Sequence, residues 1–331
     1  MIFPKFLWLC RLFRRPAQLG WFHHPATARY IPPNHPESPQ RIDAIRDELQ
    51  RQKIWPHLTA IQGREATDLE IALAHSRSYL FRLEAACPQP GKIHRLDDDT
   101  ILTHNALKAA RFATGTVLKA VDYILTGKVK NAFCAIRPPG HHAHSRQSGS
   151  FCLLNHIAVA ALYAATRHRL QRIAILDFDI HRGDGTEEIL NGHPNIQILG
   201  ISQNRLYPFN NTPTPSNCHN IPLPPNCTSL FFRENIRQEW LPRLKAYGPQ
   251  LILLSAGFDG HNDDPLSDTK LHHADYAWLT HKIMHHAPKG CGIVSILEGG
   301  YQLEPLAKST AAHLYVLAGL GKPDYAAEYV L

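Results

Sequence analysis

The sequence lacks the features that mark small secreted, membrane-spanning and repetitive proteins. Its 331 residues contain seven cysteines, an odd number, and no two of them stand in a CxxC spacing. A disulfide framework is therefore not expected, and a reducing compartment, the cytoplasm, fits the composition better. The sequence shows no internal repeat, no low-complexity block and no apolar run long enough to cross a bilayer. These absences leave the class of globular proteins, and a hydrophobic content of 44% can supply a sizeable core.

The positive charge of the chain is dispersed along its length. The formal net charge is +7 at pH 7, but no basic run and no motif of stacking aromatic residues accompanies it. We therefore expect no direct nucleic-acid partner. Residues 1–19 combine the apolar stretch 6–10 with nearby arginines and no small-residue cleavage site. We interpret residues 1–19 as an extension that lies on a surface without stable membrane insertion, and residues 20–331 as one domain.

Apolar runs alternate with helical patterns along this domain. Short runs rich in branched aliphatic residues begin near residues 131, 172, 197, 251 and 292, and helical stretches cover residues 155–169 and 273–286. The alternation predicts an α/β fold, a single domain with a mostly parallel, multi-stranded β-sheet flanked by helices. Two proline-rich segments, residues 31–39 and 208–225, are predicted to be surface loops.

A cluster of metal-binding side chains follows the apolar run at residues 172–176. Asp177, Asp179 and His181 alternate with Phe178 and Ile180. In an extended chain the two carboxylates and the imidazole would project to one side. Ionised carboxylates at the end of a buried strand need a cation or hydrogen-bond donors beside them. Taken alone, the pattern fits a helix cap followed by a surface histidine equally well.

A second strand ends in a similar way, which favours the metal. The apolar residues 249–255 lead to Asp259 and then to His261. Open α/β sheets place their sites at the carboxyl ends of strands, so Asp179, His181 and Asp259 can meet there. Two aspartates and one histidine with an open fourth position suit a catalytic zinc ion, although iron or cobalt accept the same ligands.

Two further predicted strands end in groups suited to proton transfer and hydrogen bonding. The first leads into RPPGHH, residues 137–142, and the second into EGGY, residues 298–301. Imidazoles titrate near neutrality, so the histidine pair could take a proton from a bound water and return it to a leaving amine. Asp177 and Asp184 are candidate orienting partners for the two rings. Tyr301 offers a donor to an oxyanion, although Gly-Gly-Tyr alone is typical of a turn with a packed aromatic ring.

Together these motifs resemble those of the histone deacetylase family, including bacterial acetylpolyamine amidohydrolases. The likeness is carried by RPPGHHA (137–143), DFDIHRGDGT (177–186), SAGFDGHNDDPL (255–266) and EGGY (298–301). Residues 34–41, 99–104 and 105–110 are also similar to family segments, so the likeness spans about residues 21–310. The resemblance implies the arginase/deacetylase fold and a catalytic domain at residues 20–331.

The resemblance also implies a role for each candidate residue. A single zinc ion is expected on three ligands: Asp179, His181 and Asp259. The residues implied in catalysis are His142 backed by Asp184 as the principal base and acid, His141 backed by Asp177 as an electrostatic partner, and Tyr301. A monovalent cation, K⁺ or Na⁺, is expected beside the zinc, held partly by Asp177 and by the backbone carbonyls of Asp179 and His181. The residues expected to contact substrate are Phe151, Gly149, Ser150, Gly300, Tyr207 and Asp98.

The chain departs from the family pattern on one side of the expected pocket. Ser150-Phe-Cys and then Asn155-His156 stand where the family usually has Gly-Phe-Cys followed by Asn-Asn. Tyr207-Pro-Phe-Asn-Asn-Thr replaces the common Tyr-Pro-Gly-Thr-Gly, and Ser202 stands in place of a histidine. These differences predict a pocket whose rim and one wall are this chain's own.

Three classes of function remain open at this level. The first is a zinc amidohydrolase that removes acetyl or longer acyl groups from an amine, with N-acyl-lysine side chains, free acetyl-lysine and acetylated polyamines as candidate substrates. The second is a binuclear manganese ureohydrolase of the arginase type, which needs bridging ligands that a His-His pair does not supply. The third is an inactive acyl-lysine binder, from which the loss of Tyr301 or a metal ligand would be expected.

Overall fold

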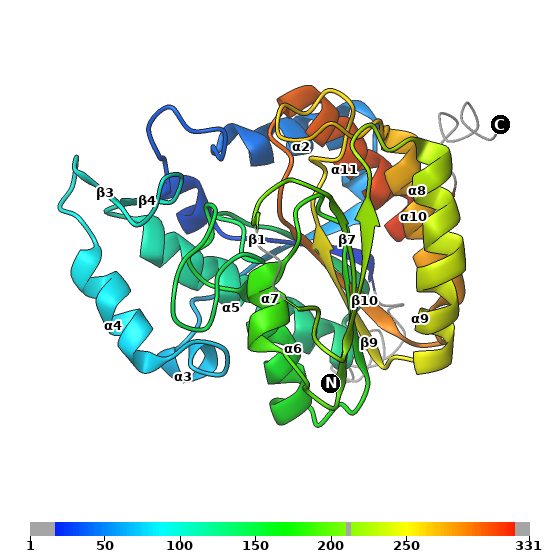
Figure 1. Cartoon of the computed structure of the whole chain (residues 1–331), viewed down its shortest axis with the longest axis horizontal. Helices are drawn as coiled ribbons and strands as arrows, with labels where there is room; N and C mark the ends of the chain where they lie inside the picture. Colours follow the sequence, from blue (N-terminus) through cyan, green and yellow to red (C-terminus); the bar gives the residue numbers. More distant parts are fainter. Residues whose placement is uncertain (1–16, 210–212, 322–331) are drawn as a thin grey trace, which may run out of the picture.

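The computed structural model describes residues 17–209 and 213–321 (Figure 1). These residues contain one eight-stranded sheet in the order β2-β1-β5-β10-β9-β6-β7-β8. Every strand pairing in it is parallel. The strands are β1 (Ala17–His23), β2 (Leu58–Gln62), β5 (Val129–Ala135), β6 (Ile173–Asp177), β7 (Ile196–Gln203), β8 (Cys218–Leu223), β9 (Leu251–Ala256) and β10 (Gly292–Leu297). The predicted single-domain α/β architecture with a parallel sheet is confirmed.

Helices follow most of the strands and cover both faces of the sheet. The α-helices are α2 (Gln40–Arg51), α3 (Asp68–Ile71), α4 (Arg77–Ala86), α5 (Ala106–Leu125), α6 (His156–Arg167), α7 (Asp184–Ile189), α8 (Ser229–Asn235), α9 (Leu241–Tyr247), α10 (His273–His286) and α11 (Leu303–Leu317). The remaining elements are η1 (Pro25–Arg29), η2 (Trp55–His57), η3 (Ile236–Trp240) and the antiparallel pair β3 (Ile93–Arg95) and β4 (Ile101–Thr103). The two predicted helices correspond to α6 and α10.

Alternate residues of the central strands feed two separate apolar layers. In β9, Leu251 and Leu253 belong to the layer that packs against α5 and α6. Ile252 and Leu254 belong to the layer on the opposite face, which packs against α2, α10 and α11. In Figure 1 the helices α8 to α10 lie on one side of the sheet and α5 and α6 on the other. Burial on both faces explains why these strands are continuous apolar runs with no polar alternation.

The four central strands do not follow chain order. β9 and β10 lie between β5 and β6, although both come later in the sequence. Because all four run in parallel, their carboxyl ends lie side by side at the same end of the sheet. Each of the four sequence motifs begins where one of these strands ends.

Two boundaries differ from those predicted from sequence. The proline-rich segment 208–225 is not entirely a loop, because residues 218–223 form β8 at the edge of the main sheet. β1 begins at Ala17, so residues 17–19 of the expected extension belong to the sheet. The remainder of that extension, residues 1–16, lies outside the described residues. Within the described residues, no helix combines the length and apolar character needed to cross a membrane.

Candidate active site

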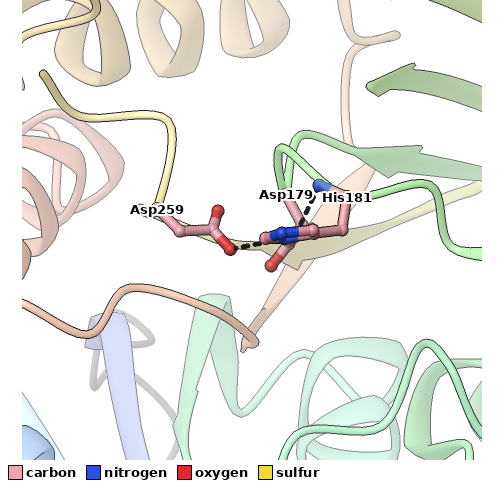
Figure 2. Close-up of side chains that lie close together, drawn as sticks. All are labelled: Asp179, His181 and Asp259. Carbon is pink, nitrogen blue, oxygen red and sulfur yellow. Dashed lines mark hydrogen bonds and ion pairs between the residues drawn. The ribbon is translucent and has the colours of Figure 1, made fainter. Parts of the chain in front are cut away.

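The candidate metal ligands predicted from sequence lie together just after the carboxyl ends of β6 and β9. Asp179, His181 and Asp259 each offer a ligand atom, and these atoms lie within 4.8 Å of one another. His181 Nδ1 is 3.2 Å from an oxygen of Asp179 and 3.0 Å from an oxygen of Asp259. Figure 2 shows the three side chains pointing toward one another from two separate loops. Asp179 and Asp259 are buried, so their charges are costly unless a positive charge or hydrogen-bond donors lie beside them.

The side chains of Asp179 and His181 are not brought together by an extended chain, as the alternation in the sequence predicts, but by a bend. β6 ends at Asp177, and the chain then bends through residues 179–181. Backbone N–H groups hold the bend, since Asp177 accepts from Asp179 N at 3.2 Å and Asp179 accepts from His181 N at 2.9 Å. Phe178 and Ile180 are buried in the apolar layer beneath the bend. The metal-binding groups are therefore aimed by a tight turn, with the apolar neighbours serving as anchors.

Glycine is required where the loop after β10 passes the two carboxylates. Gly299 N donates to Asp179 Oδ2 at 2.8 Å. A Cβ atom on Gly299 would lie 2.2 Å from Asp259 Oδ2, which is closer than any side chain allows. Gly300 has φ +112°, a backbone conformation that suits glycine alone. The two glycines of the EGGY motif thus let the backbone reach the metal-binding groups and then turn toward Tyr301.

The histidine pair lies beside the metal-binding cluster, and each ring has its own carboxylate. His141 Nδ1 is 3.1 Å from Asp177 Oδ2, and His142 Nδ1 is 2.8 Å from Asp184 Oδ1. The structure thus brings together the two pairs expected from sequence. The rings are 4.0 Å apart between centroids, and both are almost fully buried.

The pKa values of the two histidines are shifted in opposite directions. Burial lowers the pKa of His142 to about 4, and the neighbouring positive charge of His141 adds to this against the pull of Asp184. Burial also opposes the charge on His141, but Asp179 and Asp177 raise the pKa of His141 well above its usual value. One ring is therefore suited to accept a proton and the other to carry a positive charge.

A cavity of about 250 Å³ opens above the metal-binding cluster. It is lined by Asp99, Pro139, His141, His142, Ser150, Phe151, Cys152, Asp179, His181, Leu206, Tyr207, Phe209, Leu266 and Tyr301. Phe151 packs edge-on against Tyr301 at 5.5 Å, and Tyr207 packs edge-on against His142 at 4.7 Å. Burial raises the pKa of Tyr301 well above its usual value, so its hydroxyl stays protonated and can donate a hydrogen bond.

The expected substrate-contacting residues divide into three groups. Phe151, Ser150 and Tyr207 line the cavity. Gly149 and Gly300 lie behind the wall, where Gly149 lets the chain pass close to the carbonyl of His142 and Gly300 accepts a hydrogen bond from Arg41. Asp98 is exposed and is not among the lining residues.

The neighbouring Asp99 does line the cavity and is partly buried. Burial and the neighbouring Asp97 raise the pKa of Asp99 to about 6. A run of three aspartates at residues 97–99 gave no sequence signal to choose among them.

The departures noted at Asn155 and His156 do not alter the cavity. Asn155 caps α6 and donates to the carbonyls of His141 and Ala143. His156 is buried between Thr114 and the carbonyl of Pro138. Both side chains support the histidine loop from behind. Ser202 is not among the residues that line the cavity, and its hydroxyl accepts a hydrogen bond from Asn220.

Sequence reasoning missed a buried ionic network that joins the loop of the histidine pair to the loop of Tyr301. Arg137, which opens the histidine loop, makes two bonds of 2.6 Å to the carboxylate of Glu37. The same carboxylate accepts from Arg41, which also donates to the carbonyls of Glu298 and Gly300 beside Tyr301. All three ionic side chains are fully buried. The predicted loop at residues 31–39 was the available signal, since it carries Glu37 and leads to Arg41.

Glu298 is a second residue that sequence reasoning did not single out. Its carboxylate accepts from the backbone N–H groups of Gly140 and His141, at 2.7 and 3.2 Å. Burial raises the pKa of Glu298 to about 7. Glu298 therefore fixes the histidine loop from the neighbouring strand end.

The fold and this site define an α/β protein in which an Asp-His-Asp cluster that could hold a metal ion lies beside a pair of buried histidines. Comparison with known proteins narrows this class. The sequence profile described as histone deacetylase domain matches residues 35–317. The chain belongs to the histone deacetylase family.

Individual relatives and a solved structure agree with this assignment. The chain is 37% identical over 289 residues to an uncharacterized protein of Synechocystis, covering 85% of this chain and 93% of that protein. It is 31% identical to a probable deacetylase of Archaeoglobus fulgidus, covering 92% of this chain and 87% of the relative. It is also 34% identical to the type-2 histone deacetylase 2 of Dictyostelium discoideum over 89% of this chain, but spans only 20% of that larger protein. The crystal structure of the HDA15 HD domain superposes with a TM-score of 0.82 at 27% identity, covering 94% of this chain and 92% of that one.

Proposed function

We propose that this protein is a zinc-dependent amidohydrolase that removes acetyl or other acyl groups from N-acyl-lysine side chains or acetylated polyamines. The observation that carries the proposal is one cavity lined by Asp179, His181, both carboxylate-backed histidines and Tyr301, with the ligand atom of Asp259 close to those of Asp179 and His181. Family membership supports hydrolase activity, and the cavity supplies the residues for it.

The residues fit a single zinc ion. Two carboxylates and one imidazole are a set that zinc accepts, and the approach of His181 Nδ1 to both aspartates orients all three toward a common point. When bound, zinc would polarise the substrate carbonyl and make water a stronger acid. By resemblance to the family we also propose K⁺ or Na⁺ beside it, held partly by Asp177 and by the backbone carbonyls of Asp179 and His181.

The histidines divide the proton chemistry between them. His142, with its lowered pKa, is neutral at pH 7 and can take a proton from the attacking water through Nε2, because Nδ1 faces Asp184. The same ring then gives the proton to the leaving amine. His141, whose Nδ1 faces Asp177, would act as an electrostatic partner for the negative charge that develops beside it.

Tyr301 completes the site by donating a hydrogen bond to the carbonyl oxygen as it becomes an oxyanion. Its position is set by its neighbours, since Phe151 packs on its ring and its backbone N–H donates to Asp264 at 2.7 Å. A donor fixed in this way loses little entropy at the transition state, which favours rate over ground-state binding.

The lining of the cavity supports an amine-bearing substrate. Asp99 lines the cavity and is only partly buried, so its carboxylate could bind the amide or ammonium group of the chain that carries the acyl group. Phe151 and Tyr207 provide aromatic walls for the methylene chain that enters between them. The six cysteines in the described part of the chain are free thiols, which supports a cytoplasmic location.

Neither alternative class gains support from the site. Among residues 17–209 and 213–321 one cluster satisfies metal-ligand geometry, while a binuclear manganese centre needs additional bridging ligands. The two histidines that would have to contribute are instead paired with Asp177 and Asp184. An inactive binder would have no use for a complete set of proton-transfer groups.

The decisive experiment is a panel of acylated amines with the purified chain loaded with one equivalent of zinc. We expect acetate release from an acetyl-lysine peptide, free acetyl-lysine or an acetylated diamine, and loss of release after chelation with recovery on zinc addition. Absence of hydrolysis across the panel in the zinc, iron and cobalt forms would refute the amidohydrolase assignment.

A further inference from the structure

A third histidine lies behind the histidine pair and shares one of its carboxylates. His144 Nε2 is 3.2 Å from Asp184 Oδ2, while the other oxygen of Asp184 is 2.8 Å from His142 Nδ1. Asp184 is therefore held between two imidazole rings. Its side chain is 6% exposed and that of His144 is 20% exposed, so the second ring separates the carboxylate from solvent.

The backbone holds His144 in place. Its N–H donates to the carbonyl of Gln147 at 2.9 Å, and its own carbonyl lies 3.0 Å from the ring of the buried His75. The next residue, Ser145, bonds Glu188 through both its N–H and its hydroxyl. The ring of His144 is thus directed at Asp184 by contacts on both sides and is not a freely rotating surface histidine.

The tautomer of His144 is constrained as well. Its Nδ1 faces the carboxylate of Glu188 at 3.9 Å, and its Nε2 faces Asp184. The hydrogen bond with Asp184 raises the pKa of His144 above its usual value. The ring therefore presents an N–H donor to Asp184.

We propose that His144 is a positioning residue for the deacylation reaction, because it anchors the second oxygen of Asp184 and so fixes the orientation of His142. The inference rests on the proposed function. A carboxylate bonded through one oxygen can rotate about its Cβ–Cγ bond, whereas one bonded through both cannot. Because His142 transfers the proton through Nε2, a rotation of Asp184 would move Nε2 away from the attacking water. Outer partners of this kind orient the groups that act in catalysis.

The test compares two substitutions that differ only in reach. In His144→Gln the amide nitrogen occupies the position of Nε2 and can still donate to Asp184. In His144→Asn the amide nitrogen occupies the position of Nδ1 and cannot reach Asp184. Both replacements are neutral and polar, so differences in burial and charge are small.

We expect His144→Asn to lower kcat about tenfold with KM and zinc content unchanged, which is the low end of the effect of removing an outer partner. His144→Gln should keep kcat within about twofold of wild type on the same grounds. A matched control is His168, whose Nε2 lies 2.8 Å from Asp122 in a half-exposed pair between α5 and α6. His168→Asn should leave kcat unchanged.

A spectroscopic measurement separates this inference from the proposed function. The Nδ1–H proton of His142, bonded to Asp184, should give a downfield NMR signal, assigned by its loss in His142→Ala. The signal should persist in His144→Gln and broaden or disappear in His144→Asn. If the wild-type protein hydrolyses no acylated amine, the proposed function fails and this signal alone decides. Equal behaviour of the Asn and Gln variants, in rate or in this signal, overturns the role of His144.

Discussion

The residues of β9 and Asp259 in the loop after it are buried to the same degree, but the strand residues are mainly apolar and Asp259 is a carboxylate. All six residues of Leu251–Ala256 are buried in apolar surroundings, and three positions further on Asp259 is fully buried as a carboxylate. The same contrast holds for β6 and Asp179. Apolar burial stabilises the folded chain, whereas two carboxylates side by side destabilise it unless a cation lies between them. The strands thus form the apolar interior of the sheet, and the loops after their carboxyl ends carry the candidate site.

Removing a metal ligand should produce the largest change at the charged edge. We expect Asp259→Ala to lose its zinc and its hydrolytic activity, and to lose the rise in Tm that zinc gives the wild-type protein. Metal analysis and thermal unfolding with and without zinc check this. Asp263→Ala, a change at an exposed aspartate of the same loop, serves as the control and should keep both properties. Full zinc content in Asp259→Ala would defeat the assignment of this residue.

Removing the proton acceptor should act on turnover alone. His142→Ala should lower kcat by a factor of about a thousand while zinc stays bound, because we propose that this ring moves protons and is not a ligand. The measurement is kcat together with zinc content. Loss of zinc in this variant would place His142 among the metal-binding groups and contradict the division of roles proposed for the histidines.

Removing the oxyanion donor should give a smaller loss. Tyr301→Phe keeps the ring that packs on Phe151, so we expect kcat to fall on the order of a hundredfold with little change in KM. Tyr247→Phe removes a hydroxyl that donates to the carbonyl of Asn195 at a remote position and should leave kcat unchanged. Wild-type turnover in Tyr301→Phe with zinc bound would mean that the tyrosine only packs.

Truncating a buried apolar side chain of β9 should lower the stability of the protein and leave kcat unchanged. Leu253→Ala deletes a fully buried side chain from the layer that packs against α5 and α6, and should lower the free energy of unfolding by about 3 kcal/mol. Because the side chain lies away from the site, kcat of the folded fraction should remain that of the wild type. Chemical denaturation and activity measured on the same samples check this. A large loss of kcat without loss of stability would contradict the separation of the two regions.

The smallest effect is expected at Asp99. Asp99→Asn should raise KM for a cationic substrate about threefold, the scale of a partly exposed ion pair, and should raise KM for an uncharged acyl amide less, because the asparagine carbonyl can still accept a hydrogen bond from an amide. Since burial and Asp97 raise the pKa of Asp99 to about 6, its carboxylate gains a proton as the pH falls through that value. KM of the wild type for the cationic substrate should therefore rise between pH 7 and pH 5, and this rise should be absent in Asp99→Asn.

The sequence predicted the apolar central strands and the charged residues that follow them, but not the buried ion pairs that fix the loops of the site. Strand-end position was sufficient to place Asp179, His181 and Asp259 together, because parallel strands share one carboxyl edge. It could not show that Glu37 bridges Arg41 and Arg137, since the two ion pairs join residues 4 and 100 positions apart and depend on the folded chain. It could not choose Asp99 over Asp98, because the three aspartates differ only in how one short turn is oriented.

The missed strand β8 has a simple physical reason. Pro222 interrupts the apolar pattern and lacks a backbone N–H, which normally argues against a strand. β8 is the last strand of the sheet and pairs with β7 alone, so one side of its backbone needs no partner strand. Proline is tolerated at such an edge, and sequence patterns do not show which strand will occupy it.

The position of β9 and β10 between β5 and β6 has a consequence for synthesis of the chain. When the ribosome has made residues up to about 200, β5 and β6 are complete but the strands that will separate them do not yet exist. In the nascent chain β5 and β6 therefore each lack the neighbour that they have in the finished sheet, and strands without a neighbour are prone to pair with other chains. Closure must wait for residues near 300, so a chaperone that shields nascent chains should raise the yield of active protein more than it raises the yield of total protein.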